Sequence, residues 1–232
     1  MKKLAILQSS YIPWKGYFDL INMVDEFVFF DTAQYTKNDW RNRNIIKTKQ
    51  GSKWLTIPCA QRSLEQSILE TKITDPRWAR KHWQTLSQNY SKSKFFGEYK
   101  AIFEDFYLGC DFLDLSTINF SLIKIVNEIL GIDTRLTWSH EYEILDGKTE
   151  KLISLCEQAG ADVYLSGPSA KDYFDMGLAE ENGIQVEWMD YSGYPEYRQL
   201  HEPFEHGVTI LDLIFNEGPN ATQYMKSFGY ND

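Results

Sequence analysis

The feature that most constrains the fold is a short strand–loop–helix–strand unit at the start of the sequence. The apolar run 4–7 predicts a buried strand, which ends in polar and proline-containing residues. Beyond Gly16, apolar side chains recur at helical spacing, at Tyr17, Leu20, Ile21 and Val24. The aromatic and β-branched run 26–31 predicts a second strand. A unit of this length is typical of one crossover between two parallel strands.

Strands and helices also alternate in the second half of the sequence. Apolar runs predict strands at 136–139, 163–165 and 184–189, and helical spacing predicts helices at 151–159, 210–216 and 221–227. Alternation at both ends predicts an α/β fold with a Rossmann-like, mostly parallel sheet. We expect a single domain over residues 1–232.

The middle of the sequence has a different character. Residues 45–47 and 54–57 flank a Lys-Gln-Gly-Ser turn and predict a hairpin. Aromatic and leucine residues then recur at helical spacing, which predicts helices at 77–90, 99–107 and 116–130. We interpret residues 75–130 as a helical insertion in the α/β domain.

Charge and composition exclude several classes of function. The formal net charge of −9 repels nucleic acid, so we expect no nucleic-acid partner. No apolar stretch approaches the roughly 20 residues of a membrane span. The three cysteines have no C-x-x-C spacing and the four histidines form no H-x-H or H-x-x-x-H pair, so we predict no disulfide framework and no metal site. Mg²⁺ bound by carboxylates is the alternative that stays open. The expected location is the cytoplasm.

The loop between the first strand and the first helix is the first candidate for a ligand site. It combines polar side chains, aromatic rings, a lysine and a glycine at a predicted helix start, where free N–H groups favour an anion. Gly16 would let a ligand approach the backbone closely. An alternative is a connecting loop whose aromatic rings only pack on the sheet. The predicted site residues are Gln8, Ser9, Tyr11, Trp14, Lys15 and Gly16.

The loop after the second strand is the second candidate, because it is a dense cluster of basic residues in an acidic chain. Arg41 and Arg43 are predicted clamps for a diphosphate, since guanidinium groups bind phosphate in a bidentate manner. Asp31 is predicted to orient or deprotonate an acceptor. Lys15 is predicted to hold the diphosphate together with the two arginines, and it is the second predicted catalytic residue. A solvated loop with surface ion pairs is the alternative. The remaining predicted residues are Gln34, Tyr35, Lys37, Trp40 and Asn42.

A third loop follows the strand predicted at 163–165. Small and hydroxyl-bearing residues at such a point suit phosphate or hydroxyl groups, although a turn and helix cap would use the same residues. A nucleophilic serine is disfavoured, because the G-x-S-x-G motif is missing. The predicted binding residues are Ser166, Gly167, Ser169 and Tyr173. Since carboxyl ends of parallel strands meet at one edge, we expect the first two loops to face each other, with the third nearby.

Six ordered blocks between Lys3 and about Pro219 resemble the WbqC-like protein family. They are QSSYIPWKGYFDLIN, FFDTAQYTKNDWRNRN, KWLTIPC, ADVYLSGPSAKDYFD, YPEYRQ and FEHGVTILDLIFNEGP. The resemblance implies a role in bacterial O-antigen or other surface-polysaccharide biosynthesis, where other enzymes of that process are possible partners. It supplies no catalytic residues and no cofactor, so the cofactor stays unknown.

Three functions are compatible with these observations. The leading hypothesis is a transferase that adds an acyl or aminoacyl group to a nucleotide-linked amino sugar, with Trp14, Tyr11 and Trp40 stacking on a base or sugar. The second is a nucleotidyl- or adenylyl-transferase, because the first loop is similar to the HxGH signature of those enzymes, with Trp14 and Tyr17 in place of its histidines. The third is a non-catalytic accessory protein that binds a sugar intermediate.

Overall fold

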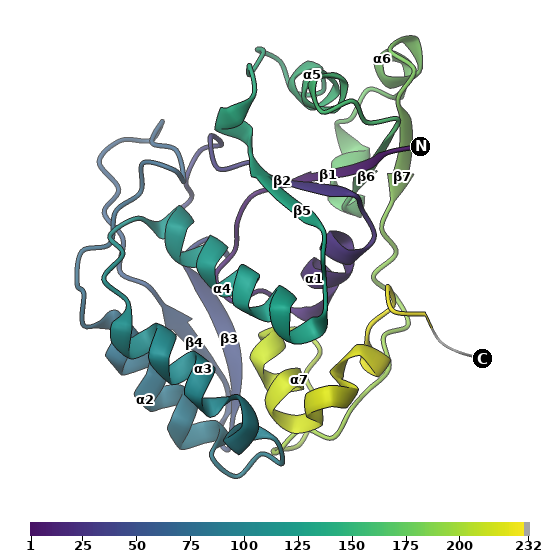
Figure 1. Ribbon diagram of the computed structural model, residues 1–232. Coiled ribbons are helices and arrows are strands. Elements are labelled where there is room, and N and C mark those ends of the chain that lie inside the picture. The colour runs from purple at the N-terminus through teal and green to yellow at the C-terminus, as the bar shows by residue number, and fades with distance from the viewer. Residues whose placement is uncertain (230–232) are drawn as a thin grey trace.

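The computed structural model describes residues 1–229 and contains a five-stranded sheet (Figure 1). All four neighbouring pairs are parallel, in the spatial order β5-β2-β1-β6-β7. If the strands of this sheet are numbered one to five along the chain, their spatial order is 3-2-1-4-5. This is the order of the first five strands of a Rossmann fold. The predicted Rossmann-like α/β fold is therefore confirmed. The strands are β1 (Lys3–Leu7), β2 (Glu26–Phe29), β5 (Arg135–Trp138), β6 (Val163–Ser166) and β7 (Gln185–Trp188).

Helices cover both faces of this sheet, because alternate residues of each strand point to opposite sides. Ala5, Phe27 and Phe29 pack in one apolar cluster with α1 (Lys15–Asn22) and α4 (Leu115–Leu130). Leu4, Ile6 and Val28 pack in a second cluster with α5 (Glu150–Gln158) and α6 (Met176–Glu181). In Figure 1, α1 and α5 lie on opposite sides of the sheet.

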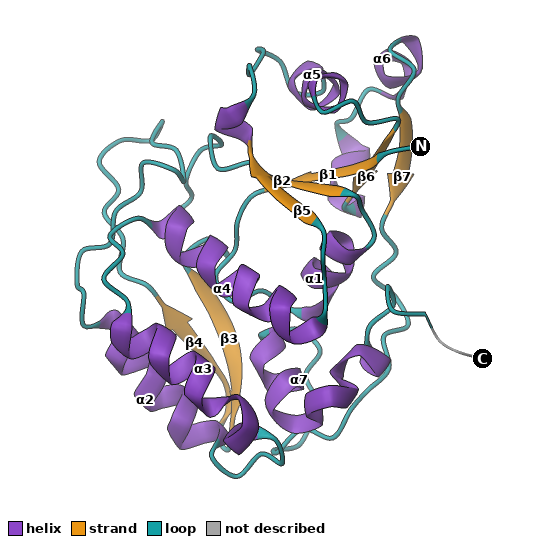
Figure 2. Cartoon of the chain, in the orientation of Figure 1, coloured by secondary structure: helices purple, strands orange, loops and turns teal. Residues whose placement is uncertain are grey.

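The segment between β2 and β5 begins with the predicted hairpin, formed by β3 (Arg43–Thr48) and β4 (Gly51–Thr56). Helices α2 (Trp78–Tyr90) and α3 (Phe96–Gly109) follow and pack against each other, and α4 then returns to the sheet (Figure 2). The three predicted helices are confirmed within a few residues at each end. Their apolar side chains belong to the same cluster as those of α1, so this segment shares a core with one face of the sheet.

The last part of the described chain departs from prediction in one element. Helix α7 (Ile210–Glu217) occurs as expected, but the α-helix predicted at 221–227 is wrong. Residues Gly218–Tyr224 form the 3₁₀ helix η3 instead, with Pro219 in its first turn. Two further 3₁₀ helices, η1 (Ser139–Glu141) and η2 (Pro168–Asp172), follow the carboxyl ends of β5 and β6.

The order of the strands creates a switch point beside β1. The chain leaves β1 toward β2 and β5 on one side, and β6 and β7 are added on the other side. The loops that leave the carboxyl ends of β1 and β6 therefore diverge, and a crevice opens between them. Within residues 1–229, no helix is long and apolar enough to cross a membrane.

Asp19 connects α1 to the last described residues. Its carboxylate is fully buried and accepts hydrogen bonds from the Tyr194 hydroxyl at 2.5 Å, the Lys226 N–H at 3.0 Å and the Ser227 N–H at 2.8 Å. Asp19→Ala would leave these three donors and the Ser227 hydroxyl without an acceptor. We expect a loss of about 3 kcal/mol or more in the free energy of unfolding, measured by urea denaturation.

The exposed Asp105 on α3 provides the control for this change. Asp105→Ala is expected to alter the free energy of unfolding by less than about 0.5 kcal/mol. Equal losses in the two variants would contradict a special role for Asp19.

Candidate functional site

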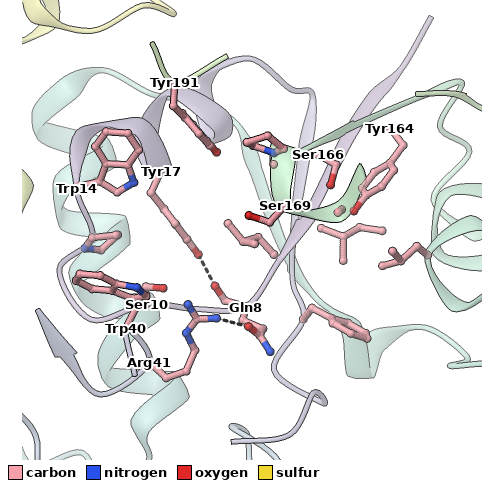
Figure 3. Close-up of a pocket in the computed structure, with 18 of the residues that line it drawn as sticks. Gln8, Ser10, Trp14, Tyr17, Trp40, Arg41, Tyr164, Ser166, Ser169 and Tyr191 are labelled. Atoms are coloured by element: carbon pink, nitrogen blue, oxygen red, sulfur yellow. Dashed lines mark hydrogen bonds between the residues drawn. The ribbon is translucent and has the colours of Figure 1, made fainter. Parts of the chain in front are cut away.

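A cavity of about 910 Å³ lies at the switch point (Figure 3). Leu7 and Gln8, at the carboxyl end of β1, contribute to its lining, as do Ser166 and Gly167 at the end of β6. The volume lies near the upper end of the range of about 300–1,000 Å³ that is typical of small-molecule sites. Both its place and its size indicate a ligand site.

One wall of the cavity stands on the α1 face of the sheet and is mainly aromatic. Trp14 packs against Tyr191 with ring centroids 5.2 Å apart, and Trp40 and Tyr17 also line this wall. The Tyr17 hydroxyl donates to the Gln8 carbonyl at 3.0 Å (Figure 3). Such rings suit the flat faces of a base or sugar.

Arg41 supplies the charge of this α1-side wall. Its guanidinium donates to the side-chain oxygen of Gln8, and its buried Nε has no hydrogen-bond partner among the described residues. A buried donor without an acceptor is costly, and the Arg43 Nε outside the lining has no partner either, so the part of Arg41 that serves a ligand is the rest of its guanidinium group.

The opposite wall stands on the α5 face of the sheet. It includes Phe30, Tyr164 and Tyr173, together with Lys148, which precedes α5, and Lys151 in its first turn. The Lys151 Nζ lies 5.9 Å from the centroid of the Phe30 ring. This wall therefore joins an apolar surface to two ammonium groups.

The charge of the lining has one sign. Among residues 1–229, no aspartate or glutamate lines the cavity, whereas Arg41, Lys148 and Lys151 do, along with His206. This contrasts with the net charge of −9 for the whole chain. Low-dielectric walls with cations alone attract anions. The described part of the chain also contains no cluster of three or more histidine, cysteine or carboxylate side chains that could hold a metal ion.

A buried polar clamp lies behind the α1-side wall. Asp31 is 1% exposed and accepts hydrogen bonds from the Ser9 N–H at 2.8 Å and the Ser116 hydroxyl. The Asn119 amide donates to the Ser9 hydroxyl at 3.0 Å and to the Arg41 carbonyl at 2.9 Å. Helix α4 thus holds the first two loops together, and the Tyr11 N–H donates directly to the Trp40 carbonyl at 3.0 Å. The expected facing of these loops is confirmed.

Burial dominates the electrostatics of Asp31. Desolvation raises the pKa of this carboxyl, and the hydrogen bonds from Ser116 and Ser9 and the charge of Arg41 oppose that effect. Both carboxylate oxygens are used inside the protein, and Asp31 does not line the cavity. Its predicted role as a base stays a prediction, whereas its contacts position the loops.

Eight of the predicted site residues line the cavity. They come from all three predicted loops and are Gln8, Trp14, Trp40, Arg41, Ser166, Gly167, Ser169 and Tyr173. The other ten lie outside the lining and have contacts of a different kind. They are Ser9, Tyr11, Lys15, Gly16, Asp31, Gln34, Tyr35, Lys37, Asn42 and Arg43.

Tyr11 and Gly16 have structural contacts. The Tyr11 ring is fully buried, and its hydroxyl meets the His82 Nδ1 at 2.8 Å and the Tyr107 hydroxyl at 2.7 Å. A Cβ atom at Gly16 would overlap the indole ring of Trp14. The glycine therefore makes room for Trp14, which itself lines the cavity.

Only some of the predicted residues of the second loop line the cavity, and the others make contacts elsewhere in the protein. Arg43 begins β3 and its guanidinium lies 4.1 Å from the Trp54 ring centroid, and the buried Asn42 donates to the Ile57 carbonyl at 2.9 Å. Tyr35 is buried and Gln34 donates to the Leu64 carbonyl, while Lys37 is exposed. Of the two predicted arginine clamps, the structure brings Arg41 alone into the lining.

The sequence interpretation missed much of the α5-side wall. Lys148 and Lys151 precede and begin the helix after the third strand of the sheet, so they lie at the same carboxyl edge as the three predicted loops. Their position after a strand of the predicted parallel sheet was the signal in the sequence that could have identified them as site residues. Tyr191 and His206 come from the long irregular segment after β7, whose path no periodicity reveals.

Asn119→Ala tests the polar clamp. The change removes donors to Ser9 and to the buried Arg41 carbonyl, so we expect the free energy of unfolding to fall by about 2 kcal/mol. Amide hydrogen exchange should accelerate in residues 8–16 and 31–43, as measured by mass spectrometry. Asn127→Ala is the matched control on the same helix, because both side chains are buried with an unpartnered oxygen but only the Asn119 amide donates to the two loops. Similar exchange in both variants would argue against the clamp.

Lys15 predicts a pH dependence of stability. Its side chain is 3% exposed, and Nζ donates to the Pro195 carbonyl at 3.0 Å beside the Tyr194 ring. Burial lowers the pKa of Lys15 from its ordinary 10.5 to about 8. Between these values the unfolded chain holds a proton that the folded chain has released, so this group makes the folded state more stable as pH rises.

Lys15→Met removes that titration. In urea denaturation, the free energy of unfolding of the variant relative to the wild type should be highest below pH 8. It should then decline as pH rises from about 8 to about 10.5. The exposed Lys124, changed to Met, should give a difference that does not vary with pH. A constant difference for Lys15→Met would contradict the lowered pKa.

Comparisons with known proteins agree with the resemblance found in the sequence. A family model described as the WbqC-like protein family matches residues 8–224. The protein named "Uncharacterized protein Rv1507c" from Mycobacterium tuberculosis is 49% identical over 227 residues, which cover 97% of this chain and 98% of that protein. No solved structure matches the chain. The model match includes all three loops at the cavity, and the chain belongs to the WbqC-like protein family.

Proposed function

We propose that this protein is a transferase of bacterial surface-polysaccharide biosynthesis that binds a nucleotide-linked amino sugar and adds an acyl or aminoacyl group to it. The observation that carries the proposal is the cavity at the switch point, with three cations and, within residues 1–229, no carboxylate in its lining. Doubly wound folds bind nucleotides at this place. The family resemblance supplies the polysaccharide context.

In this proposal the α1-side wall binds the nucleotide sugar. Arg41 contacts the diphosphate, because a guanidinium group matches phosphate oxygens in geometry and charge. The Trp14 and Trp40 rings stack on the base or the sugar, as both line the wall. Ser166 and Ser169 offer hydroxyl groups to the sugar from the end of β6.

The transfer step joins the sugar amine to the carbonyl carbon of an activated donor. A C–N bond forms, the bond from the carbonyl carbon to the donor's leaving group breaks, and the amine loses a proton. His206 lines the cavity, and its imidazole is the candidate general base that accepts this proton. The catalytic roles predicted for Asp31 and Lys15 would be indirect, through the wall that each supports.

A nucleotidyl- or adenylyl-transferase is the second candidate. It is favoured by the strand order and by a cavity that opens after β1, at the start of α1. Trp14 and Tyr17, which stand in place of the two signature histidines, both line that cavity. Release of pyrophosphate from ATP or CTP with a phosphosugar or carboxylate would support this candidate. Binding of a nucleotide sugar without turnover of any donor would favour the accessory protein.

Arg41→Ala and Arg43→Ala form a matched pair for the main proposal. Each variant removes one guanidinium group, and the two positions are two residues apart in the sequence. Of the two arginines, Arg41 alone lines the cavity, whereas Arg43 packs on Trp54. Calorimetry with UDP-, dTDP- and GDP-linked amino sugars should show about 10- to 100-fold weaker binding for Arg41→Ala, the loss expected for a charged hydrogen bond. Arg43→Ala should bind as the wild type does. Equal affinities for all three proteins would refute the assignment of Arg41.

A further inference from the structure

The cations of the cavity come from opposite faces of the sheet. Arg41 belongs to the loop after β2, which α4 holds on the α1 face through Asn119. Lys148 lies just before α5 and Lys151 is in its first turn, and the apolar residues of α5 pack on the other face with Leu4 and Ile6. The carboxyl ends of β1 and β6 lie between these two walls. The cavity therefore has two cationic regions, one on each wall.

The α5-side wall is built like the binding surface for an anion. Among the described residues, neither Lys148 nor Lys151 has an ion-pair partner, although Lys2, Lys3 and Lys226 each pair with a carboxylate elsewhere. Lys148 is exposed and Lys151 is half-buried, with its ammonium nitrogen 5.9 Å from the centroid of the Phe30 ring. The neighbouring acids in the sequence are Asp146 and Glu150; both lie outside the cavity lining, and the Glu150 carboxylate lies against Gly147.

The lining also gives each region its own apolar surface. Trp14, Trp40 and Tyr191 accompany Arg41, while Phe30, Tyr164 and Tyr173 accompany the two lysines. A volume of about 910 Å³ exceeds what the smaller ligands in the typical range of about 300–1,000 Å³ require. The two sets of cations stand on opposite faces of the sheet, so the lysine wall offers contacts of its own to a second ligand.

We infer that the Lys148–Lys151 wall binds a second, phosphate-bearing substrate while the nucleotide sugar occupies the Arg41 wall. The chemical identity that we assign to each of the two substrates rests on the proposed function. The second substrate is then the phosphate-bearing donor of the acyl or aminoacyl group, with its reactive end at the sheet edge between the walls. The two ammonium groups contribute charge, and the ring of Phe30 contributes apolar contact to the part of the donor nearest the phosphate.

The stoichiometry of pyrophosphate binding tests this inference without knowledge of either substrate. Calorimetry at low ionic strength should give two equivalents of inorganic pyrophosphate per wild-type chain. Arg41→Ala should retain one equivalent, K148A/K151A should retain one, and the combined variant should bind none. The control K49A/K124A removes two exposed lysines outside the cavity lining, with the same change in net charge, and should still bind two.

Other outcomes would overturn the inference. One equivalent in the wild type, lost in both variant sets, would mean that a single anion bridges the walls. One equivalent that survives in K148A/K151A, or no binding at all, would mean that the lysine wall holds no anion. An equal loss in K49A/K124A would reduce the effect to overall charge.

The proposed function fails in a different way. If no nucleotide sugar binds the wild type but two equivalents of pyrophosphate do, the two anion sites stand and the identity of the substrate is wrong. If a nucleotide sugar binds and the second equivalent is missing, the proposed function stands and the lysine wall does not bind a second substrate.

Discussion

The parallel pairing of β1 with β2 on one side and β6 on the other is the constraint on which the rest of the structure depends. Because each pair is parallel, the chain must cross back from the carboxyl end of one strand to the amino end of the next, and the crossover helices cover the two faces of the sheet. Because the order reverses beside β1, the loops after β1 and β6 separate and leave the cavity between them. The location of the site is thus a consequence of backbone pairing, and the side chains determine what binds there.

Much of this arrangement was predictable because the relevant signals are local. The run 4–7, the helical spacing after Gly16 and the run 26–31 predicted the first crossover, and with it the meeting of the first two loops. The roles of single residues were less predictable, because they depend on contacts distant in sequence. From the sequence, Tyr11 looks like an exposed ring near Trp14. In the structure the ring lies in the core, where its hydroxyl forms hydrogen bonds with His82 and Tyr107 of the inserted helices.

The buried carboxylates show the same limit in another form. From sequence, Asp31 at the end of a strand is a candidate base, and nothing local reveals that Ser116, 85 residues later, uses one of its oxygens. The structure places such groups where they hold loops rather than where they meet a ligand. Asp31 fastens two loops from behind the cavity, and Asp19 fastens the last described residues to α1. An acidic chain thus keeps its negative charge out of the lining, at least within residues 1–229.

The close contact between Gly16 and Trp14 has a consequence for how the cavity tolerates change. The indole ring occupies the space that any side chain at position 16 would need, and on its other side it borders the cavity. A larger residue at this position would displace the ring toward the ligand. The Trp14 ring would then occupy part of the cavity. A single methyl group at position 16 would thus reduce ligand binding without contacting the ligand itself.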